Sequence, residues 1–325
     1  MARYNGPRGA VGWALGLTGA LTAAAFAAAA RGGRMSRKAL PPALSTEPAP
    51  SPDRANLAAR RLNRSAGTLA ASVLFDSAVE HYRGSFENKA MYTPLVTSAL
   101  ALAVSAHGTA DKRAKSHWAR DSVYALTGLV GLAGTGFHFW NVSQKPGRFT
   151  WQNLFYGAPL GAPMAIGLSG LLGFFSERVR DTPAGETPRL FGLPAGRVIG
   201  AVSGAGMIGT TAEAGLLHFR GSFHDPFMML PITMPPAAAA ALTNASLGDT
   251  RTDRRLTRWW LRATAIMGVS GTVFHAIGVG RDMDGWRNIQ QNLLNGPPIP
   301  APPAFTGLAL AGLAALDLME DDSDV

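Results

Sequence analysis

The sequence predicts an all-α membrane protein, a polytopic helical bundle with about nine membrane spans. Hydrophobic residues make up 47% of the chain and charged residues 16%, whereas soluble domains carry roughly 25% charged residues. The charges lie in short stretches between long apolar runs, as expected where a charge at the bilayer centre costs about 2.5–3.5 kcal/mol. The main body also consists of one sequence unit written twice in tandem.

Nine segments approach the length of about 20 mostly apolar residues that a membrane-spanning helix needs. The first, Ala10–Ala30, is interpreted as a retained N-terminal anchor helix, although its small-residue end would also permit cleavage as a signal peptide. The other eight predicted spans are Ser65–Val79, Ala90–Ala106, Ser122–Val142, Tyr156–Phe175, Val198–Leu217, Phe227–Leu247, Trp259–Gly280 and Gly296–Leu316.

These spans divide the chain into four parts. Residues 1–64 hold the anchor helix and a Pro-rich basic linker, in which Arg54–Arg64 is expected to form a short helix on the membrane surface. Residues 65–190 and residues 191–318 form the two four-helix units. Residues 319–325 form an acidic tail.

The tandem repeat is visible at a constant spacing. The segment His81–Phe86 recurs as His218–Phe223, an offset of 137 positions. Further pairs at this offset are Asp76 with Glu213, Met91 with Met228, Gly131 with Gly268, Gly134 with Gly271, and His138 with His275. After two inserted residues, Asn153 matches Asn292 at an offset of 139. Because each unit has four spans, both enter the membrane in the same sense, and a pseudo-twofold axis along the membrane normal is expected.

Basic residues are distributed unevenly between alternate loops. Four segments hold 21 of the 30 Lys and Arg residues: Arg31–Arg64, Lys112–Arg120, Arg178–Arg197 and Arg251–Arg262. The positive-inside rule places these segments in the cytoplasm, with the N-terminus outside and the C-terminus inside a bacterial inner membrane. The net charge of +9 follows from these loops. The expected partner is therefore the lipid bilayer and not nucleic acid.

Each unit carries one carboxylate, two histidines and one arginine near its predicted outer end. These candidate site residues are Asp76, His81, Arg83 and His138 in the first unit, and Glu213, His218, Arg220 and His275 in the second. Asp76 and His81 are five residues apart, about 140° around a helix. This separation disfavours a single metal site within one unit and leaves a site shared by both units open.

Two kinds of cofactor fit these residues. Haem b would take His81 and His138, and in the second unit His218 and His275, as axial ligands. Gly134, one turn before His138, and Gly271, one turn before His275, would then leave room for the macrocycle, unless such glycines serve close helix packing. Arg83 would pair with a propionate. A non-haem metal would use one carboxylate and two imidazoles, the set that suits Fe(II), Mn or Zn. The leading hypothesis is that one of these cofactors serves a redox role, with a membrane or periplasmic redox partner.

Two further functions remain open. In a transporter, the acids would be proton or cation sites along a substrate path. In a structural or assembly subunit, the same groups would be buried polar struts without a cofactor. Cysteine is absent, which excludes thiolate metal sites and cysteine nucleophiles. No P-loop, dinucleotide-binding glycine pattern or Gly-x-Ser-x-Gly motif is present, so the sequence assigns neither an enzymatic activity nor a ligand.

Overall fold

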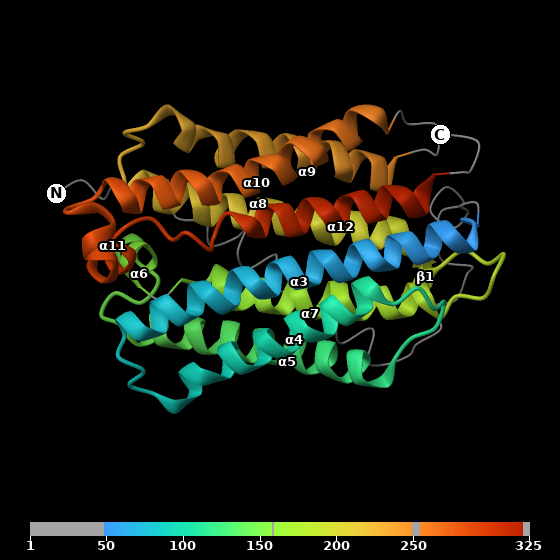
Figure 1. Cartoon of the computed structure of the whole chain (residues 1–325), viewed down its shortest axis with the longest axis horizontal. Helices are drawn as coiled ribbons and strands as arrows, with labels where there is room; N and C mark the ends of the chain where they lie inside the picture. The colour runs from blue at the N-terminus through green and yellow to red at the C-terminus, as the bar shows by residue number, and fades with distance from the viewer. Residues whose placement is uncertain (1–48, 158, 249–253, 321–325) are drawn as a thin grey trace.

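A computed structural model describes residues 49–157, 159–248 and 254–320. In this part of the chain it contains ten α-helices, three 3-10 helices and one two-stranded hairpin (Figure 1). The prediction of an all-α chain is therefore confirmed. The predicted anchor helix, Ala10–Ala30, lies outside the described residues.

Each helix of the first half has a counterpart in the second half, which also contains one additional 3-10 helix, η4 (Gly285–Asn288). The first half contains α3 (Pro52–Arg83), η2 (Lys89–Tyr92), α4 (Thr93–Ala110), α5 (Trp118–Gln144), α6 (Trp151–Tyr156) and α7 (Gly161–Arg180). The second half contains α8 (Ala195–Arg220), η3 (Pro226–Met229), α9 (Leu230–Leu247), α10 (Arg255–Arg281), η4 (Gly285–Asn288), α11 (Ile289–Asn295) and α12 (Pro303–Met319). The hairpin of β1 (Arg189–Leu190) and β2 (Leu193–Pro194) joins the halves. The bounds of α4 and α9, and those of α5 and α10, differ by the sequence offset of 137.

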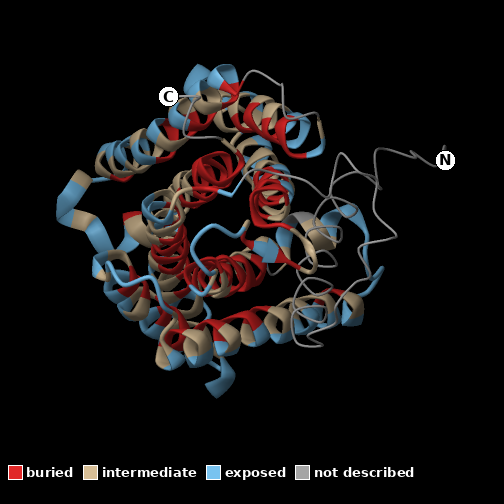
Figure 2. Cartoon of the chain, turned by 90° about the vertical axis from the view of Figure 1, so that its right-hand side faces the viewer, coloured by how far each residue is buried: buried red, intermediate tan, exposed pale blue. Residues whose placement is uncertain are grey.

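Four long helices form the centre of the bundle. α3 packs against α7 and α12, and α8 packs against α12 and α7. The pair α4 and α5 covers one side of this centre, and the pair α9 and α10 covers the other (Figure 1). Buried side chains are concentrated on the central helices, and the outer pairs are exposed on their outward sides (Figure 2). The largest apolar cluster includes Leu62, Leu171, Phe175, Ile199 and Leu308.

α3 is longer than the predicted first span of this unit. It begins at Pro52, so Arg54–Arg64 is the first part of α3. The sequence-based expectation of a separate surface helix in this stretch is therefore wrong. The reason is packing, because Leu62 in this stretch is fully buried in the central core. Its basic side chains also find partners inside the bundle, as the ion pair of Arg61 with Asp317 shows.

The outer helices expose apolar side chains at helical spacing. On α10, Ile266, Val269, Val273 and Ile277 are 66%, 58%, 55% and 42% exposed. In a soluble bundle such an apolar stripe would face the core. Among the described residues, three helical segments are long and apolar enough to cross a membrane: Lys89–Ala110, Pro226–Leu247 and Arg255–Arg281.

Candidate functional site

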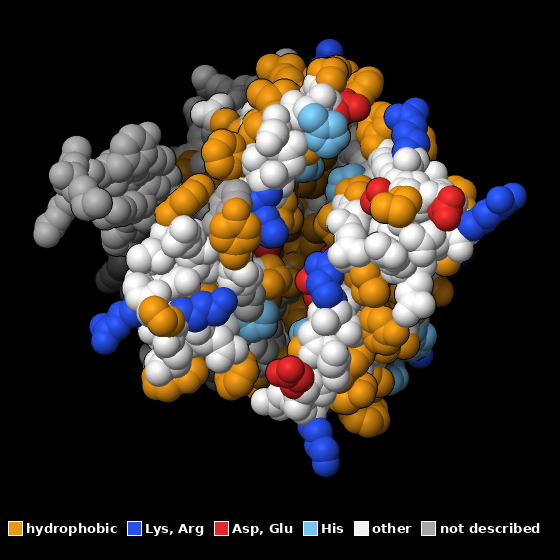
Figure 3. All heavy atoms as spheres, turned by 90° about the vertical axis from the view of Figure 1, so that its left-hand side faces the viewer, with side chains coloured by type: hydrophobic (Ala, Val, Ile, Leu, Met, Phe, Trp, Pro, Cys, Tyr) orange, Lys and Arg blue, Asp and Glu red, His pale blue; other side chains and the backbone are white. Residues whose placement is uncertain are grey.

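The predicted site residues come from one end of the bundle, the left-hand end in Figure 1. Here α3 ends at Arg83 and α8 ends at Arg220, beside the short helices α6 and α11. Figure 3 looks onto this end, where histidine, basic and acidic side chains surround a central hollow. We call this end the histidine end.

All four predicted histidines bind a backbone carbonyl through Nδ1. The pairs of histidine and carbonyl residue are His81 with Met91 (2.6 Å), His218 with Met228 (3.0 Å), His138 with Pro159 (2.7 Å) and His275 with Pro298 (2.7 Å). The carbonyl partners correspond between the halves, as the histidines do. A carbonyl oxygen only accepts hydrogen bonds, so Nδ1 carries the proton and, in the neutral ring, Nε2 keeps a free lone pair.

The histidines of each half lie near one another. The ring centroids of His218 and His275 are 6.3 Å apart, with the rings nearly perpendicular. His81 and His138 are close enough to interact electrostatically. Each half therefore holds two imidazoles together at the histidine end.

The two acids meet between the halves. Asp76 and Glu213 interact electrostatically although they occupy equivalent positions in the two copies. Glu213 accepts a hydrogen bond from the backbone N–H of Gly161, and its carboxylate fills the space that a side chain at Gly161 would need. The residue equivalent to Gly161 is Pro300, which has no N–H to donate. The corresponding backbone hydrogen bond to Asp76 therefore cannot form.

Neither acid is neutralised by a direct ion pair. Within the described residues, no basic side chain lies at ion-pair distance from the carboxylate of Asp76 or Glu213. Arg83 acts on Asp76 only at longer range and forms its ion pair with Glu80, at 2.7 Å. We call Asp76 and Glu213 the carboxylate pair.

The two arginines connect the halves. Arg83 of the first half donates a hydrogen bond to the carbonyl of Leu294 in α11 of the second half. Arg220 of the second half lies over the ring of Tyr156 in α6 of the first half, with 5.4 Å between the guanidinium carbon and the ring centroid. Each arginine thus reaches the short helix of the opposite half, an arrangement suited to a structural strut.

Gly134 and Gly271 pack against proline and do not border an open space. A β-carbon on Gly134 would lie 3.2 Å from the side chain of Pro163, and one on Gly271 would lie 2.8 Å from that of Pro302. The interpretation that these glycines leave room for a haem macrocycle is therefore wrong. They allow α5 to approach α7 and α10 to approach α12 closely.

The predicted metal ligands are not assembled into a metal centre. Among the residues that the structure describes, no group of three or more His, Asp or Glu side chains is placed to hold a metal ion. Asp76, His81 and His138 were the predicted ligands in the first half, and Glu213, His218 and His275 in the second. The angular separation of Asp76 and His81 explains this result, because an acid and a histidine five residues apart leave the helix in different directions. The six residues occur instead as three pairs.

Asn153 and Asn292 bind backbone carbonyls in the segment that precedes each short helix. The Asn153 amide donates to the carbonyls of Pro146 and Arg148, at 2.9 and 2.7 Å. The Asn292 amide donates to the equivalent carbonyls of Met283 and Gly285, at 3.0 and 2.9 Å.

A buried ionic cluster at the opposite end was missed by the sequence analysis. Arg120 and Glu177 have fully buried side chains and form an ion pair of 2.9 Å, and Arg180 lies 3.7 Å from the same carboxylate oxygen. Asp111 pairs with Arg120 at 2.8 Å. Hydrogen bonds from Arg113 and Arg120 lower the pKa of Asp111 below its usual range. We call Asp111, Arg120, Glu177 and Arg180 the ionic cluster.

The second half has no counterpart of this cluster. The residues equivalent to Asp111, Arg120, Glu177 and Arg180 are Gly248, Thr257, Leu316 and Met319. The positive-inside rule places the segments that contain Arg120 and Arg180 in the cytoplasm and does not predict their burial. The signal in the sequence is that these charged positions of the first copy correspond to uncharged residues in the second copy.

One further ion pair occurs in both halves with its charges exchanged. Arg178 in α7 pairs with Asp121 in α5 at 2.6 Å. At the equivalent positions, Asp317 in α12 pairs with Arg258 in α10 at 3.0 Å. The same two helices are thus joined at the same place in each half by a pair of opposite polarity.

Comparison with protein-family models, with curated proteins and with solved structures gives no match.

Proposed function

We propose that this chain is an integral membrane protein with nine spans, an N-terminal anchor followed by two four-helix units related by a pseudo-twofold axis along the membrane normal. The bounds of α4 and α9, and those of α5 and α10, are related by the same offset of 137 residues, which supports the repeat. The equivalent carbonyl partners of the four histidines also support it. We place the histidine end at the outer face of a bacterial inner membrane, because the basic segments Lys112–Arg120 and Arg178–Arg197 lie at the opposite end of the bundle.

The spacing of tryptophans along α5 supports a helix that crosses a bilayer. Trp118 and Trp140 are 77% and 62% exposed and lie 22 residues apart, about 33 Å along a helix at 1.5 Å per residue. The hydrocarbon core of a bilayer is about 30 Å thick, and tryptophan is enriched at both of its boundaries. Between the two tryptophans the exposed apolar side chains of α5, Leu126, Leu129 and Phe137, would then face lipid.

The carboxylate pair carries the functional proposal, which is that Asp76 and Glu213 bind a cation. Two carboxylates that interact across the boundary of two membrane units repel one another when both are charged. Without an ion-pair partner, the stable states are those in which the pair holds a proton or a metal cation. The hollow at the histidine end would give that cation a route to the outer face (Figure 3). The class of activity is cation transport, or transport coupled to a cation.

A second candidate is ligation of a metal or haem by the histidines. The observation in its favour is the Nδ1 bonding, because histidine ligands of metals commonly fix their second ring nitrogen on a carbonyl. All four Nε2 atoms are left as possible ligands in this arrangement. Arg83 and Arg220 would then balance an anionic group of the cofactor.

Proteoliposomes test the first candidate. Purified protein is reconstituted with a pH-sensitive dye inside, and flux is measured under imposed gradients of H⁺, Na⁺ and K⁺. The variants are Asp76→Asn, Glu213→Gln and the double variant, with Glu80→Gln as a control because Glu80 is an acid of the same helix that already has an ion-pair partner. We expect flux in the wild type and in the control, and loss of flux in the double variant.

Two outcomes would overturn the cation proposal. One is the absence of flux in the wild type for all three cations. The other is equal flux in the wild type and in the double variant. The second candidate is tested on the same purified protein by its visible absorption spectrum and by elemental analysis. A Soret band or a stoichiometric metal is expected if the histidines are ligands, and blank results in both measurements reject that candidate.

A further inference from the structure

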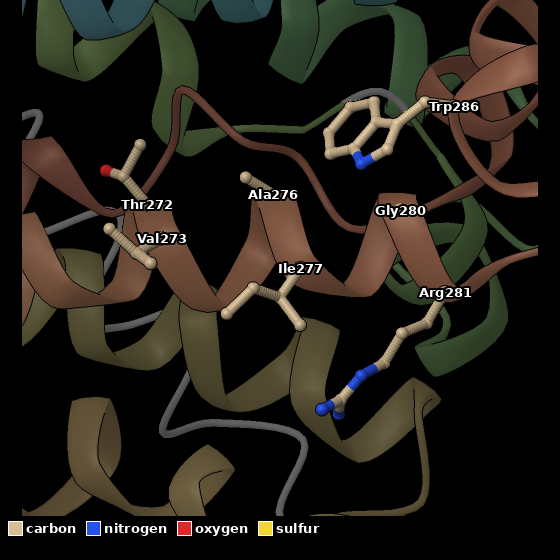
Figure 4. Close-up of a pocket in the computed structure, with 7 residues that line it drawn as sticks. All are labelled: Thr272, Val273, Ala276, Ile277, Gly280, Arg281 and Trp286. Carbon is tan, nitrogen blue, oxygen red and sulfur yellow. The ribbon is translucent and has the colours of Figure 1, made fainter.

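A trough on the outward surface of α10 distinguishes the second half from the first. Two rows of side chains at i, i+4 spacing border it: the small residues Thr272, Ala276 and Gly280, and beside them Val273, Ile277 and Arg281. Trp286 of η4 closes the end of the small row (Figure 4). The trough has a volume of about 410 Å³, within the roughly 300–1,000 Å³ of typical ligand pockets.

The chemistry of the trough is apolar along its length, with one cation at its end. Arg281 is the last residue of α10 and leaves the helix on the same side as Ile277 (Figure 4). Among the described residues, its guanidinium forms no hydrogen bond or ion pair. The nearby carboxylate of Asp282 accepts a hydrogen bond from the backbone N–H of Met283. Arg281 is thus available to an anion at the mouth of an apolar groove.

Gly280 allows Trp286 to form the end wall. A β-carbon on Gly280 would lie 2.7 Å from the indole ring, so any side chain there would displace the tryptophan. Indole is favoured at the boundary between hydrocarbon and headgroups. Trp286 and Arg281 therefore mark the level at which a lipid headgroup would lie.

The first half shows what the trough looks like when it is filled. Phe139 stands at the position of Ala276, and Phe149 stands at the position of Trp286. The rings of Phe139 and Phe149 contact one another, with 6.1 Å between their centroids. Gln144 replaces the cation of Arg281. The open groove and its charge are thus properties of the second half alone.

We propose that this trough binds one anionic phospholipid of the outer leaflet. One acyl chain lies along Thr272, Ala276 and Gly280, and the phosphodiester is bound by Arg281. A guanidinium suits phosphate because it donates two parallel hydrogen bonds. An anionic lipid is favoured over a zwitterionic one, which brings its own ammonium group to the same place. The site rests on the membrane location in the proposed function and is independent of the carboxylate pair.

Native mass spectrometry of the detergent-solubilised full chain tests this site, with phosphatidylglycerol and phosphatidylcholine titrated separately. The first half supplies the substitutions: Ala276→Phe fills the trough, and Arg281→Gln removes the charge. Arg287→Gln is the matched control, because Arg287 is an exposed arginine of the adjacent η4. A cation near a lipid surface contributes about 1 kcal/mol, roughly a fivefold change in affinity.

We expect wild type and Arg287→Gln to retain one phosphatidylglycerol more tightly than phosphatidylcholine. Arg281→Gln should lose this preference by about fivefold, and Ala276→Phe should weaken the binding of both lipids. Equal retention of the two lipids by the wild type, or unchanged retention by both trough variants, would overturn the proposal. Recovery of the protein in the membrane fraction shows that the membrane assignment holds, so a negative lipid result then counts against the trough alone. Absence of cation flux counts against the carboxylate pair and has no bearing on the lipid site.

Discussion

Replacing Glu177 by Gln should lower the free energy of unfolding by about 3–5 kcal/mol. The side chains of Glu177 and Arg120 are fully buried, and the ionic cluster contains two carboxylates and two guanidiniums. Removing the Glu177 charge leaves one positive charge without compensation inside the protein. Gln preserves the volume of the side chain, so the expected loss measures charge and not packing.

The second half provides a sharper form of the same test. A triple variant, Arg120→Thr with Glu177→Leu and Arg180→Met, gives three of the four cluster positions the uncharged residues found at the equivalent positions, and Asp111 keeps its ion pair with Arg113. Removing the buried charges of a cluster together is often neutral, whereas removing one of them alone is costly. The triple variant should therefore be more stable than the single variant Glu177→Leu, although it carries two additional substitutions.

Both comparisons use denaturant unfolding in one detergent at pH 7.5, followed by tryptophan fluorescence. Asp121→Asn is the control, because the pair of Asp121 with Arg178 is partly exposed and should contribute roughly 0.2–1 kcal/mol. A loss for Glu177→Gln no larger than that of the control would refute the reasoning. So would a triple variant that unfolds more easily than Glu177→Leu.

Three further predictions concern other contacts of the fold. Exchanging the charges of one ion pair, with Arg178→Asp and Asp121→Arg together, should restore most of the stability that either substitution alone removes. A double-mutant cycle measures the interaction energy of the two positions, and an interaction energy of zero would contradict the prediction. Gly131→Ala should cost about 1–3 kcal/mol, because its β-carbon would enter the backbone of α7; Gly136→Ala, which meets nothing within 4 Å, is the control, and equal unfolding midpoints would be evidence against the contact. The pKa of Asp111 in the folded protein lies below its usual value, so the contribution of Asp111 to the free energy of unfolding is complete above its unfolded pKa of about 4 and is lost as the pH falls through the folded pKa. The stability difference between wild type and Asp111→Asn should therefore be constant near neutral pH and shrink below about pH 4. A difference that grows on acidification would contradict this prediction.

The helices could be predicted from sequence because apolar runs and their lengths are local properties. All eight spans predicted in the main body coincide with long helices, to within several residues at most ends. α3 is the exception, since its first turns contain four arginines and resemble a linker in composition. Only tertiary contacts, such as the burial of Leu62 in the central core, make that stretch part of the bundle.

The candidate site could be predicted only in part. The sequence offset singles out the histidines, arginines and acids, but it does not say what each group bonds to. The carbonyl partner of His138 lies 21 residues away in the chain, and that of Arg83 lies 211 residues away. Such partners depend on how the connecting segments fold at the histidine end. The same limit hid the ionic cluster, since Arg120 and Glu177 become neighbours only when α5 packs against α7.

Bonding to the rest of the protein separates the repeated polar residues into two classes. The histidines form hydrogen bonds to backbone carbonyls through Nδ1. The guanidiniums of Arg83 and Arg220 contact the opposite half. The side-chain amides of Asn153 and Asn292 donate to backbone carbonyls of the connecting segments. A group that holds its own fold in both copies has a sufficient structural reason to be repeated. Asp76 and Glu213 differ, because they interact electrostatically with one another and neither forms an ion pair within the described residues, although Glu213 accepts a hydrogen bond from the backbone of Gly161. A buried pair of like charges destabilises the fold that carries it, so the pair is stable only with a bound proton or cation. The carboxylate pair is therefore the first of the two proposed sites to test, by flux through the double variant.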